Sequence, residues 1–173
     1  MFMSNHPPPL RCLMVCTANI CRSPLAQAVL RHLVAAHGET RRFTVDSAAT
    51  QGHLAGERHD RRAALALASR GYVMGNGRAR LITAQDLQRF DVILAMDSHN
   101  LAELERMGTP DQQAKMHRLL DFASDVADKN IRDPYFGPAQ GFDKALLLCE
   151  AGCRGLLHHV LNSPWHAVAG RQP

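Results

Sequence analysis

The chain has 173 residues, of which 46% are hydrophobic and 21% charged, so the composition excludes a wholly disordered protein and predicts one globular domain. Glycine and proline number only 12 and 9, which excludes collagen-like and low-complexity proteins. The formal net charge is +4, and eight of the 17 arginines fall between positions 41 and 80, where only three acidic residues oppose them. We interpret this stretch as a solvated surface that attracts anions and expect no nucleic-acid binding, because it has only two aromatic residues and no recognition motif.

Apolar periodicity predicts strands that alternate with helices along the chain. We expect strands over Leu10–Val15, Phe43–Ala48, Phe90–Met96 and Lys115–Leu120. We expect helices from Ser23 to about Gly38, over Glu57–Arg70 and Thr83–Gln88, from Asp97 or Ser98 to Met107, and over Ala139–Asn162. Ser23 and Pro24 favour a helix start because serine caps free N–H groups and proline suits the first helical position. Such alternation predicts an α/β fold with a parallel sheet and helices on both faces.

The ends of the chain differ in composition from its middle. We expect residues 10–162 to form a single domain, the proline-rich residues 1–9 a mobile arm, and residues 163–173 a loose tail. The start has no basic segment followed by an apolar one, and no apolar run approaches the ~18 residues that cross a bilayer. Five cysteines, an odd number, favour reduced thiols over a disulfide framework. We therefore expect a cytoplasmic protein with no membrane insertion.

The residues between the first strand and the first helix carry the candidate catalytic chemistry. Cys16 ends the strand, five residues form a loop, and Arg22 leads into the helix. Ligands of open α/β sheets bind at the carboxyl ends of strands, and a helix N-terminus presents free N–H groups and a positive dipole end. Loop N–H groups and the guanidinium of Arg22 would complete a phosphate cradle. The same positive field favours a nucleophilic thiolate at Cys16, to which Ser23 Oγ can donate a hydrogen bond.

The segment Cys16-Thr-Ala-Asn-Ile-Cys-Arg-Ser-Pro24 resembles the phosphate-binding loop of the low-molecular-weight protein tyrosine phosphatases, whose signature is Cys-x5-Arg-Ser near the N-terminus. That family also has an Asp-Pro near its C-terminus, which Asp133-Pro134-Tyr135 matches. Further matches are Asp46-Ser47-Ala48, Gly77-Arg78-Ala79-Arg80 and Met96-Asp97. The resemblance covers about Leu10 to Asn162. It implies a three-layer sandwich with a four-stranded parallel sheet, flavodoxin-like and of the phosphotyrosine phosphatase I-like type.

The resemblance also implies hydrolysis of phosphotyrosine without a cofactor or a metal. Cys16 would attack phosphorus to form a cysteinyl-phosphate, Arg22 would hold the phosphate, and Asp133 would act as general acid and then as base. The phosphate-binding positions would be Thr17, Ala18, Asn19, Ile20, Cys21, Arg22 and Ser23. The implied partners are phosphotyrosine proteins, with inorganic phosphate as product. Autophosphorylating bacterial tyrosine kinases are one class of substrate on which similar enzymes act.

Other positions are expected to support the loop or to line the substrate cleft. Asn19 tolerates the left-handed region, so we expect it to brace the loop, with Ser47 as its partner. His53 falls where the family often places a wall of the cleft, and the ring of Tyr135 is expected to line the same cleft. Gly77 lies where some relatives have a histidine that supports the loop, so that contact should be absent or replaced. The role of Asp97 stays open between a helix cap and a site residue.

The remaining cysteines call for separate explanations. The resemblance favours a redox role for Cys21, which would form a disulfide with oxidised Cys16; packing under the loop is the alternative. Cys149 and Cys153 lie four residues apart on the apolar stripe of the last helix. We expect them to pack in the core rather than to bind a metal with the tandem histidines that follow, since those point about 100° apart.

Two alternatives to a phosphatase deserve comparison. An arsenate reductase on the same scaffold needs a relay of further cysteines, and positions 23–148 contain none. A non-catalytic phosphotyrosine-binding module would keep the anion loop without a nucleophile and an acid, yet Cys16 and Asp133 are both present. We therefore predict a protein-tyrosine-phosphatase and leave its physiological substrate and oligomeric state open.

Overall fold

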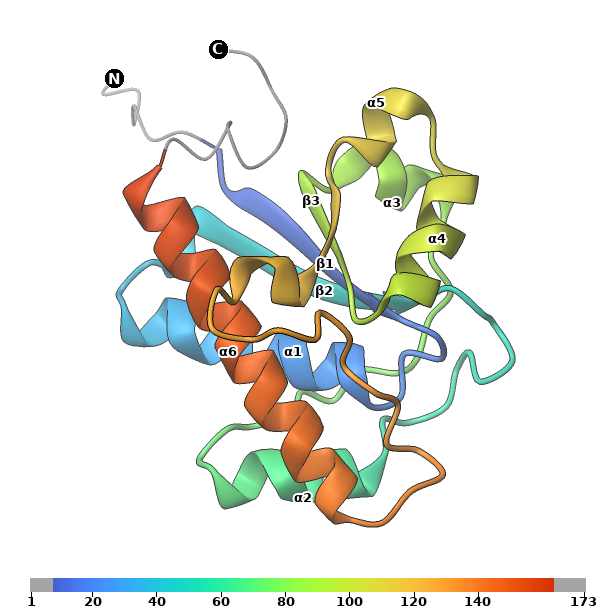
Figure 1. Cartoon of the computed structure of the whole chain (residues 1–173), viewed down its shortest axis with the longest axis vertical. Coiled ribbons are helices and arrows are strands. Elements are labelled where there is room, and N and C mark those ends of the chain that lie inside the picture. Colours follow the sequence, from blue (N-terminus) through green and yellow to red (C-terminus); the bar gives the residue numbers. More distant parts are fainter. Residues whose placement is uncertain (1–7, 164–173) are drawn as a thin grey trace.

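Four parallel strands form the central layer of the computed structural model, which describes residues 8–163 (Figure 1). The strands are β1 (Leu10–Cys16), β2 (Phe43–Ala49), β3 (Val92–Ala95) and β4 (Met116–Arg118). Their order in the sheet is β2-β1-β3-β4, and in the register Cys12 lies opposite Val45 on one side and Val92 on the other. Since the strand order changes direction between β1 and β3, the carboxyl end of β1 lies at the switch point where such sheets bind ligands. The predicted α/β fold is confirmed.

Helices cover both faces of this sheet (Figure 1). Helices α1, α2 and α6 contact one another on one face, while α4 packs on β3 and β4 and lies with α3 and α5 on the other. The structure has the helices α1 (Arg22–Ala36), α2 (Arg61–Ser69), α3 (Ala84–Arg89), α4 (Ser98–Met107), α5 (Pro110–Gln113) and α6 (Gln140–Asn162), and the 3-10 helices η1 (Thr40–Arg42) and η2 (Leu119–Phe122). Apart from residues 8 and 9 and Ser163, the predicted arm and tail lie outside the described residues.

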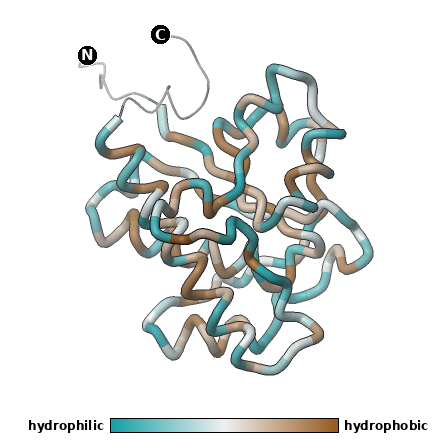
Figure 2. Tube along the Cα trace, viewed as in Figure 1, coloured by the Kyte–Doolittle hydropathy of each residue, from teal (hydrophilic) through white to brown (hydrophobic). Residues whose placement is uncertain are grey.

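The sheet separates two hydrophobic clusters because successive residues of a strand point to opposite faces. In β1, Cys12 and Met14 pack against α1 and α6, whereas Leu13 and Val15 belong to the cluster on the other face with Leu104 of α4. Figure 2 shows the same distribution along the chain, with hydrophobic segments in the strands and on one side of each long helix. A strand buried on both faces is a continuous apolar run, as β1 is from Cys12 to Cys16.

Three predicted elements are shorter in the structure than in the sequence analysis, and one of them is β3, which was predicted over Phe90–Met96 and spans Val92–Ala95. The helix predicted over Glu57–Arg70 begins only at Arg61, because the side chain of Asp60 accepts a hydrogen bond from the Arg62 N–H and caps α2. Arg58 instead pairs with Arg78 in an isolated antiparallel bridge. The strand predicted over Lys115–Leu120 ends at Arg118, where the chain turns into η2.

The helix start predicted at Ser23 was wrong by one residue, and Ser23 does not cap the helix. Helix α1 begins at Arg22, Cys21 is its N-cap, and no side chain caps it. The hydroxyl of Ser23 contacts Cys16 and Asn19 instead of the free N–H groups of the helix. These N–H groups are therefore not consumed by a side-chain cap.

The last helix is continuous although it contains Gly152 and Gly155 in its second half. Helix α6 runs from Gln140 to Asn162. A Cβ on Gly155 would lie 1.9 Å from the carbonyl oxygen of Phe122, so only glycine lets η2 approach this closely. Cys149 and Cys153 are fully buried in α6, which confirms that they pack in the core. Within residues 8–163, no helix has the length and apolarity that crossing a membrane requires.

Candidate active site

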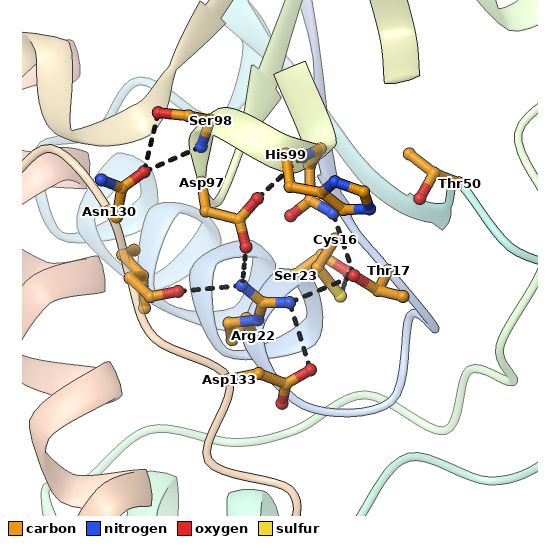
Figure 3. Close-up of polar contacts among 12 residues, drawn as sticks. Cys16, Thr17, Arg22, Ser23, Thr50, Asp97, Ser98, His99, Asn130 and Asp133 are labelled. Carbon is orange, nitrogen blue, oxygen red and sulfur yellow. Dashed lines mark hydrogen bonds and ion pairs between the residues drawn. The ribbon is translucent and has the colours of Figure 1, made fainter. Parts of the chain in front are cut away.

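The loop between β1 and α1 surrounds a buried thiol (Figure 3). Cys16 is the last residue of β1 and is only 3% exposed, and its Sγ lies 3.0 Å from Ser23 Oγ in the first turn of α1. The Asn19 amide donates to the same Ser23 oxygen over 3.0 Å. Because that oxygen already accepts a hydrogen bond, the Ser23 hydroxyl can direct its own hydrogen to the sulfur. A hydroxyl donor stabilises a thiolate more than a thiol.

Asn19 holds the loop in place through three contacts. Its φ is 57°, and it is the only non-glycine residue with positive φ among those described. Its Nδ2 donates to Ser23 Oγ and, over 2.9 Å, to Ser47 Oγ on β2, while its Oδ1 accepts from the Arg80 N–H over 3.0 Å. The predicted contact between Asn19 and Ser47 is present. Ala18, the residue before it, does not have positive φ.

The guanidinium of Arg22 is 2% exposed and joins four parts of the site (Figure 3). One terminal nitrogen donates to Asp97 and to the Ile131 carbonyl, over 2.9 Å to the latter. The other donates to Thr17 Oγ1 over 3.3 Å and to Asp133 Oδ2 over 3.2 Å. The Nε of Arg22 is buried and has no hydrogen-bond partner among the described residues. Such an N–H costs free energy until an acceptor reaches it.

Neighbouring negative groups raise the pKa values of two residues of the site, Arg22 and Cys21. Burial lowers the pKa of Arg22, but Cys16, Asp133 and Asp97 raise it by more, so the guanidinium stays charged in the interior. Burial raises the pKa of the Cys21 thiol well above its ordinary value, and nearby carboxylates raise it further. Cys21 is therefore a protonated thiol beside the loop.

A cavity of about 230 Å³ opens above the loop. Asp133 lies at its edge with a side chain 49% exposed, and its Oδ1 accepts from the Tyr135 N–H over 3.1 Å. His53 and Tyr135 both line this cavity, where the sequence analysis placed them. The full lining comprises Cys16, Thr17, Ala18, Ile20, Cys21, Arg22, Gln51, His53, Leu54, Asp133, Tyr135 and Phe136.

Gln51, Leu54 and Phe136 line the cavity, and the sequence analysis did not predict them as site residues. Phe136 is 98% exposed and its ring lies 4.8 Å from that of Tyr135, edge to face, at the mouth of the cavity.

Asp97 has both of the roles left open for it: it caps α4 by accepting from the Asn100 N–H, and it pairs with Arg22. The sequence contained an indication of this role. The polar pair Asp97-Ser98 follows the apolar strand β3, and the carboxyl ends of parallel strands such as β1 and β3 lie at the same edge of the sheet.

Gly77 leaves a space that His59 fills. A Cβ on Gly77 would stand 3.2 Å from His59 Cε1. Glycine at position 77 supplies no side chain to the loop. Three residues further on, the main-chain N–H of Arg80 donates to Asn19 Oδ1 over 3.0 Å.

Comparisons with known proteins agree with this geometry. The family model of the low molecular weight phosphotyrosine protein phosphatases matches residues 11–164. A relative from Drosophila melanogaster, named low molecular weight phosphotyrosine protein phosphatase 2, is 39% identical over 146 residues, which are 84% of this chain and 88% of the relative. The crystal structure of YfkJ from Bacillus subtilis has a TM-score of 0.86 at 32% identity, covering 91% of this chain and 98% of that one.

A further solved structure carries a different substrate in its name. DARP, a Drosophila arginine phosphatase, has a TM-score of 0.81 at 36% identity and covers 87% of this chain and 98% of its own. The family model, the sequence relative and both structures span nearly the whole described chain. This chain belongs to the family of low-molecular-weight phosphotyrosine protein phosphatases.

Proposed function

We propose that this protein-tyrosine-phosphatase hydrolyses phosphotyrosine in proteins through a cysteinyl-phosphate, with Cys16 as nucleophile, Arg22 as phosphate clamp and Asp133 as general acid and base. The observation that carries the proposal is the convergence of these three side chains on one cavity. They come from the end of β1, the start of α1 and a loop before α6, and Asp133 reaches Arg22 over 3.2 Å.

The buried Nε of Arg22 supports a phosphate in this cavity. This N–H has no acceptor among the described residues, and one terminal nitrogen is shared between Thr17 and Asp133. A phosphate oxygen would satisfy Nε and displace Asp133 from the guanidinium, because a bidentate arginine–phosphate pair is stronger than one long hydrogen bond. Asp133 would then be free to turn toward the ester oxygen of the substrate.

The first chemical step transfers the phosphoryl group to sulfur. The thiolate of Cys16 forms a bond to phosphorus while the bond from phosphorus to the phenol oxygen breaks, and Asp133 gives its proton to that oxygen. Arg22 and the N–H groups of residues 17–23 hold the three equatorial oxygens in the transition state. Ser23, donating to the sulfur, stabilises the thiolate before attack and again as the leaving group of the second step.

The second step returns the enzyme to its starting state. Water attacks phosphorus, Asp133 takes a proton from that water, and the bond from phosphorus to Cys16 sulfur breaks. Inorganic phosphate leaves, the sulfur is again a thiolate, and Asp133 is again protonated. This cycle uses only groups of this chain, and we expect a chelator to leave the activity unchanged.

The walls of the cavity favour an aryl phosphate. Ile20, Leu54, Tyr135 and Phe136 present apolar surface around the mouth, which suits a phenyl ring. Phosphoarginine is a second candidate substrate because the arginine phosphatase DARP shares the fold at 36% identity. Its guanidinium would lie against these apolar groups, so we place phosphotyrosine first.

The partner and the compartment follow from the same proposal. Phosphotyrosine proteins are the substrate class, and the bacterial tyrosine kinase expected from the sequence stays a prediction. We propose the cytoplasm as the compartment, since all five cysteines are free thiols.

The nucleophile is tested by Cys16→Ser with p-nitrophenyl phosphate, a phosphotyrosine peptide and phosphoarginine as substrates. We expect turnover of the unaltered protein with both aryl substrates, also in a chelator, and a loss of at least about 10³-fold in kcat for the variant, since serine is rarely ionised near neutral pH. Cys153→Ala, outside the cavity, is the control and keeps kcat. Turnover of Cys16→Ser within about tenfold of the control would reject Cys16 as nucleophile.

The general acid is tested by the dependence on leaving group in Asp133→Ala. We expect kcat/KM for phenyl phosphate to fall about 10²–10⁴-fold, because phenoxide leaves poorly without a proton. The loss should shrink for p-nitrophenyl phosphate, whose leaving group needs little protonation. An equal loss for both esters would mean that Asp133 only positions its loop.

A further inference from the structure

Glu103 joins helix α4 to the residues that follow β2, and the proposed mechanism gives it no role. Its Oε2 accepts from the hydroxyl of Thr50, and its Oε1 accepts from the Gln51 amide over 3.1 Å. The side chain is only 17% exposed. Burial raises the pKa of Glu103, but the hydrogen bonds from Thr50 and Gln51, together with the charges of His99 and Arg106, lower it by more, so the carboxylate is ionised and accepts from both donors.

The main chain of the same two residues is bonded to the catalytic loop. The Thr50 N–H donates to the Cys16 carbonyl over 2.9 Å, and the Gln51 N–H donates to the Thr17 carbonyl over 2.9 Å. Figure 3 shows Thr50 on the side of the loop where Thr17 lies. Thr50 and Gln51 thus face the loop with their backbone and Glu103 with their side chains.

One wall of the substrate cavity follows directly after Thr50 and Gln51 in the chain. Gln51, His53 and Leu54 line the cavity. Beyond Gln51, the next main-chain hydrogen bond from this segment to another part of the described chain is that of the Gly56 N–H to the Ala79 carbonyl, 2.7 Å long. The bond between them, from Ala55 to Gly52, lies within the turn itself. The side chain of Glu103 therefore adds to the main-chain bonds that fix the proximal end of this turn, while Leu54 packs against the core cluster at its far end.

We propose that Glu103 is a positioning residue that holds the cavity wall formed by Gln51, His53 and Leu54, and so sets the affinity for the aryl part of the substrate. A carboxylate suits this role because it accepts from two donors at once, whereas the glutamine amide has a single acceptor oxygen. The phosphate itself is bound by residues 16–23, which Glu103 does not touch. The aryl readouts rest on the proposed function; the phosphate readout does not.

Two ligands separate the wall from the loop. Inorganic phosphate occupies only the loop, whereas benzylphosphonate adds a ring that lies against the wall. For Glu103→Ala we expect the Kd of benzylphosphonate to rise about tenfold while the Kd of phosphate stays within about twofold, both measured by titration calorimetry. In turnover of phenyl phosphate, kcat/KM falls by a similar factor and kcat stays within about twofold. Glu103→Gln, which keeps one acceptor, gives an intermediate loss.

The matched control is Glu105→Gln. Glu105 lies on the same helix and is exposed, and its carboxylate has no hydrogen bond within residues 8–163. Glu105→Gln removes the same negative charge as Glu103→Gln. Equal changes in the Kd of benzylphosphonate in these two variants would mean that Glu103 acts only through its charge. Parallel shifts in the Kd of phosphate and of benzylphosphonate would assign Glu103 to the loop and overturn the proposal. An unchanged Kd for both ligands in folded Glu103→Ala would also overturn it.

A second variant tests the proposal in case Glu103→Ala does not fold. Thr50→Val removes one donor to Glu103 and keeps the volume of the side chain. We expect it to weaken benzylphosphonate more than phosphate, as Glu103→Gln does. Because calorimetry needs no turnover, an inactive but ligand-binding wild type would reject the proposed function and still decide the role of Glu103.

Discussion

At the scale of single residues, the hydrogen bonds of one amide set the direction of the catalytic hydroxyl. Asn19 donates to Ser23 and to Ser47, and it accepts from a main-chain N–H. This leaves the hydrogen of Ser23 for the sulfur of Cys16, 3.0 Å away. The left-handed φ of Asn19 makes these three contacts possible at once, since it turns the side chain into the loop.

Cys21 is expected to protect Cys16 from irreversible oxidation. Peroxide should convert Cys16 to a sulfenic acid first, because burial raises the pKa of Cys21 and keeps that thiol protonated. The sulfenic acid and the Cys21 thiol then condense to a disulfide with loss of water. After peroxide and then dithiothreitol, the unaltered protein should regain most activity, with a linkage between Cys16 and Cys21 seen by mass spectrometry before reduction.

The comparison for this prediction is Cys21→Ser. This variant should be active before peroxide treatment and recover little activity after reduction. The control Cys153→Ala removes a cysteine that does not line the cavity, and it should recover like the unaltered protein. Equal recovery of Cys21→Ser and the unaltered protein would return Cys21 to a packing role.

At the scale of elements, the position of the active-site loops depends on close contacts of α6 with the segments before it. Gly152 and Gly155 bring α6 against η2, and Cys149 of the same helix lies 3.9 Å from the Arg22 carbonyl. On the other side of α6, Glu150 is bonded to Arg70 and Tyr72 at the end of α2. Helix α6 therefore holds both α1, which begins the phosphate loop, and the segment that leads to Asp133.

Gly155→Ala is expected to destabilise the fold although alanine favours helices. The new Cβ would meet the Phe122 carbonyl oxygen at 1.9 Å, so η2 or α6 must move. We expect the free energy of unfolding to fall by about 1–3 kcal/mol, since overpacking outweighs a helix-propensity gain of about 1 kcal/mol. Urea denaturation measures it, with His158→Ala, exposed on the same helix, changing stability by about 0.5 kcal/mol or less. A more stable Gly155→Ala would show that η2 yields without cost.

At the scale of the whole molecule, half-buried histidines and paired carboxylates make stability depend on pH. Burial lowers the pKa of His59, whose two ring nitrogens have no partner among the described residues. Burial and the neighbouring His159 likewise lower the pKa of His117, against the opposite effect of Asp121. Among the acids, Asp60, Asp86 and Glu150 have lowered pKa values because the hydrogen bonds and charges around them, those of arginines among them, outweigh burial, which acts in the opposite direction.

The free energy of unfolding is expected to fall in two steps on acidification. A histidine whose pKa is lower in the folded than in the unfolded state binds more protons when unfolded, so stability falls as the pH drops below about 6.5. The carboxylates with lowered pKa values add a second loss below about pH 4.5. Urea denaturation at about pH 7.5 and about pH 5.5 measures the first step. His59→Phe should reduce that step, and an unchanged step in the folded variant would reject this account of His59.

The sequence by itself determined the fold class and the core of the site. Apolar strands alternate with amphipathic helices, and such elements bury their apolar surface only as a layered α/β sheet. Cys16, Arg22 and Ser23 were predictable because they lie within eight consecutive residues between a strand and a helix. Asp133 was found through the resemblance, since an Asp-Pro alone is typical of many turns.

The tertiary structure alone decided which distant residues complete the site. Asp97 and Gln51 reach the loop, and Glu103 reaches Gln51, because the order β2-β1-β3-β4 places the carboxyl ends of β2 and β3 on either side of that of β1. No local pattern states this order. The end of β4 depended in the same way on the packing of η2 against α6, which is a contact between elements, whereas the start of α2 is set locally by the Asp60 cap. Periodicity reports which face of an element is buried, and only the packed structure shows what that face meets.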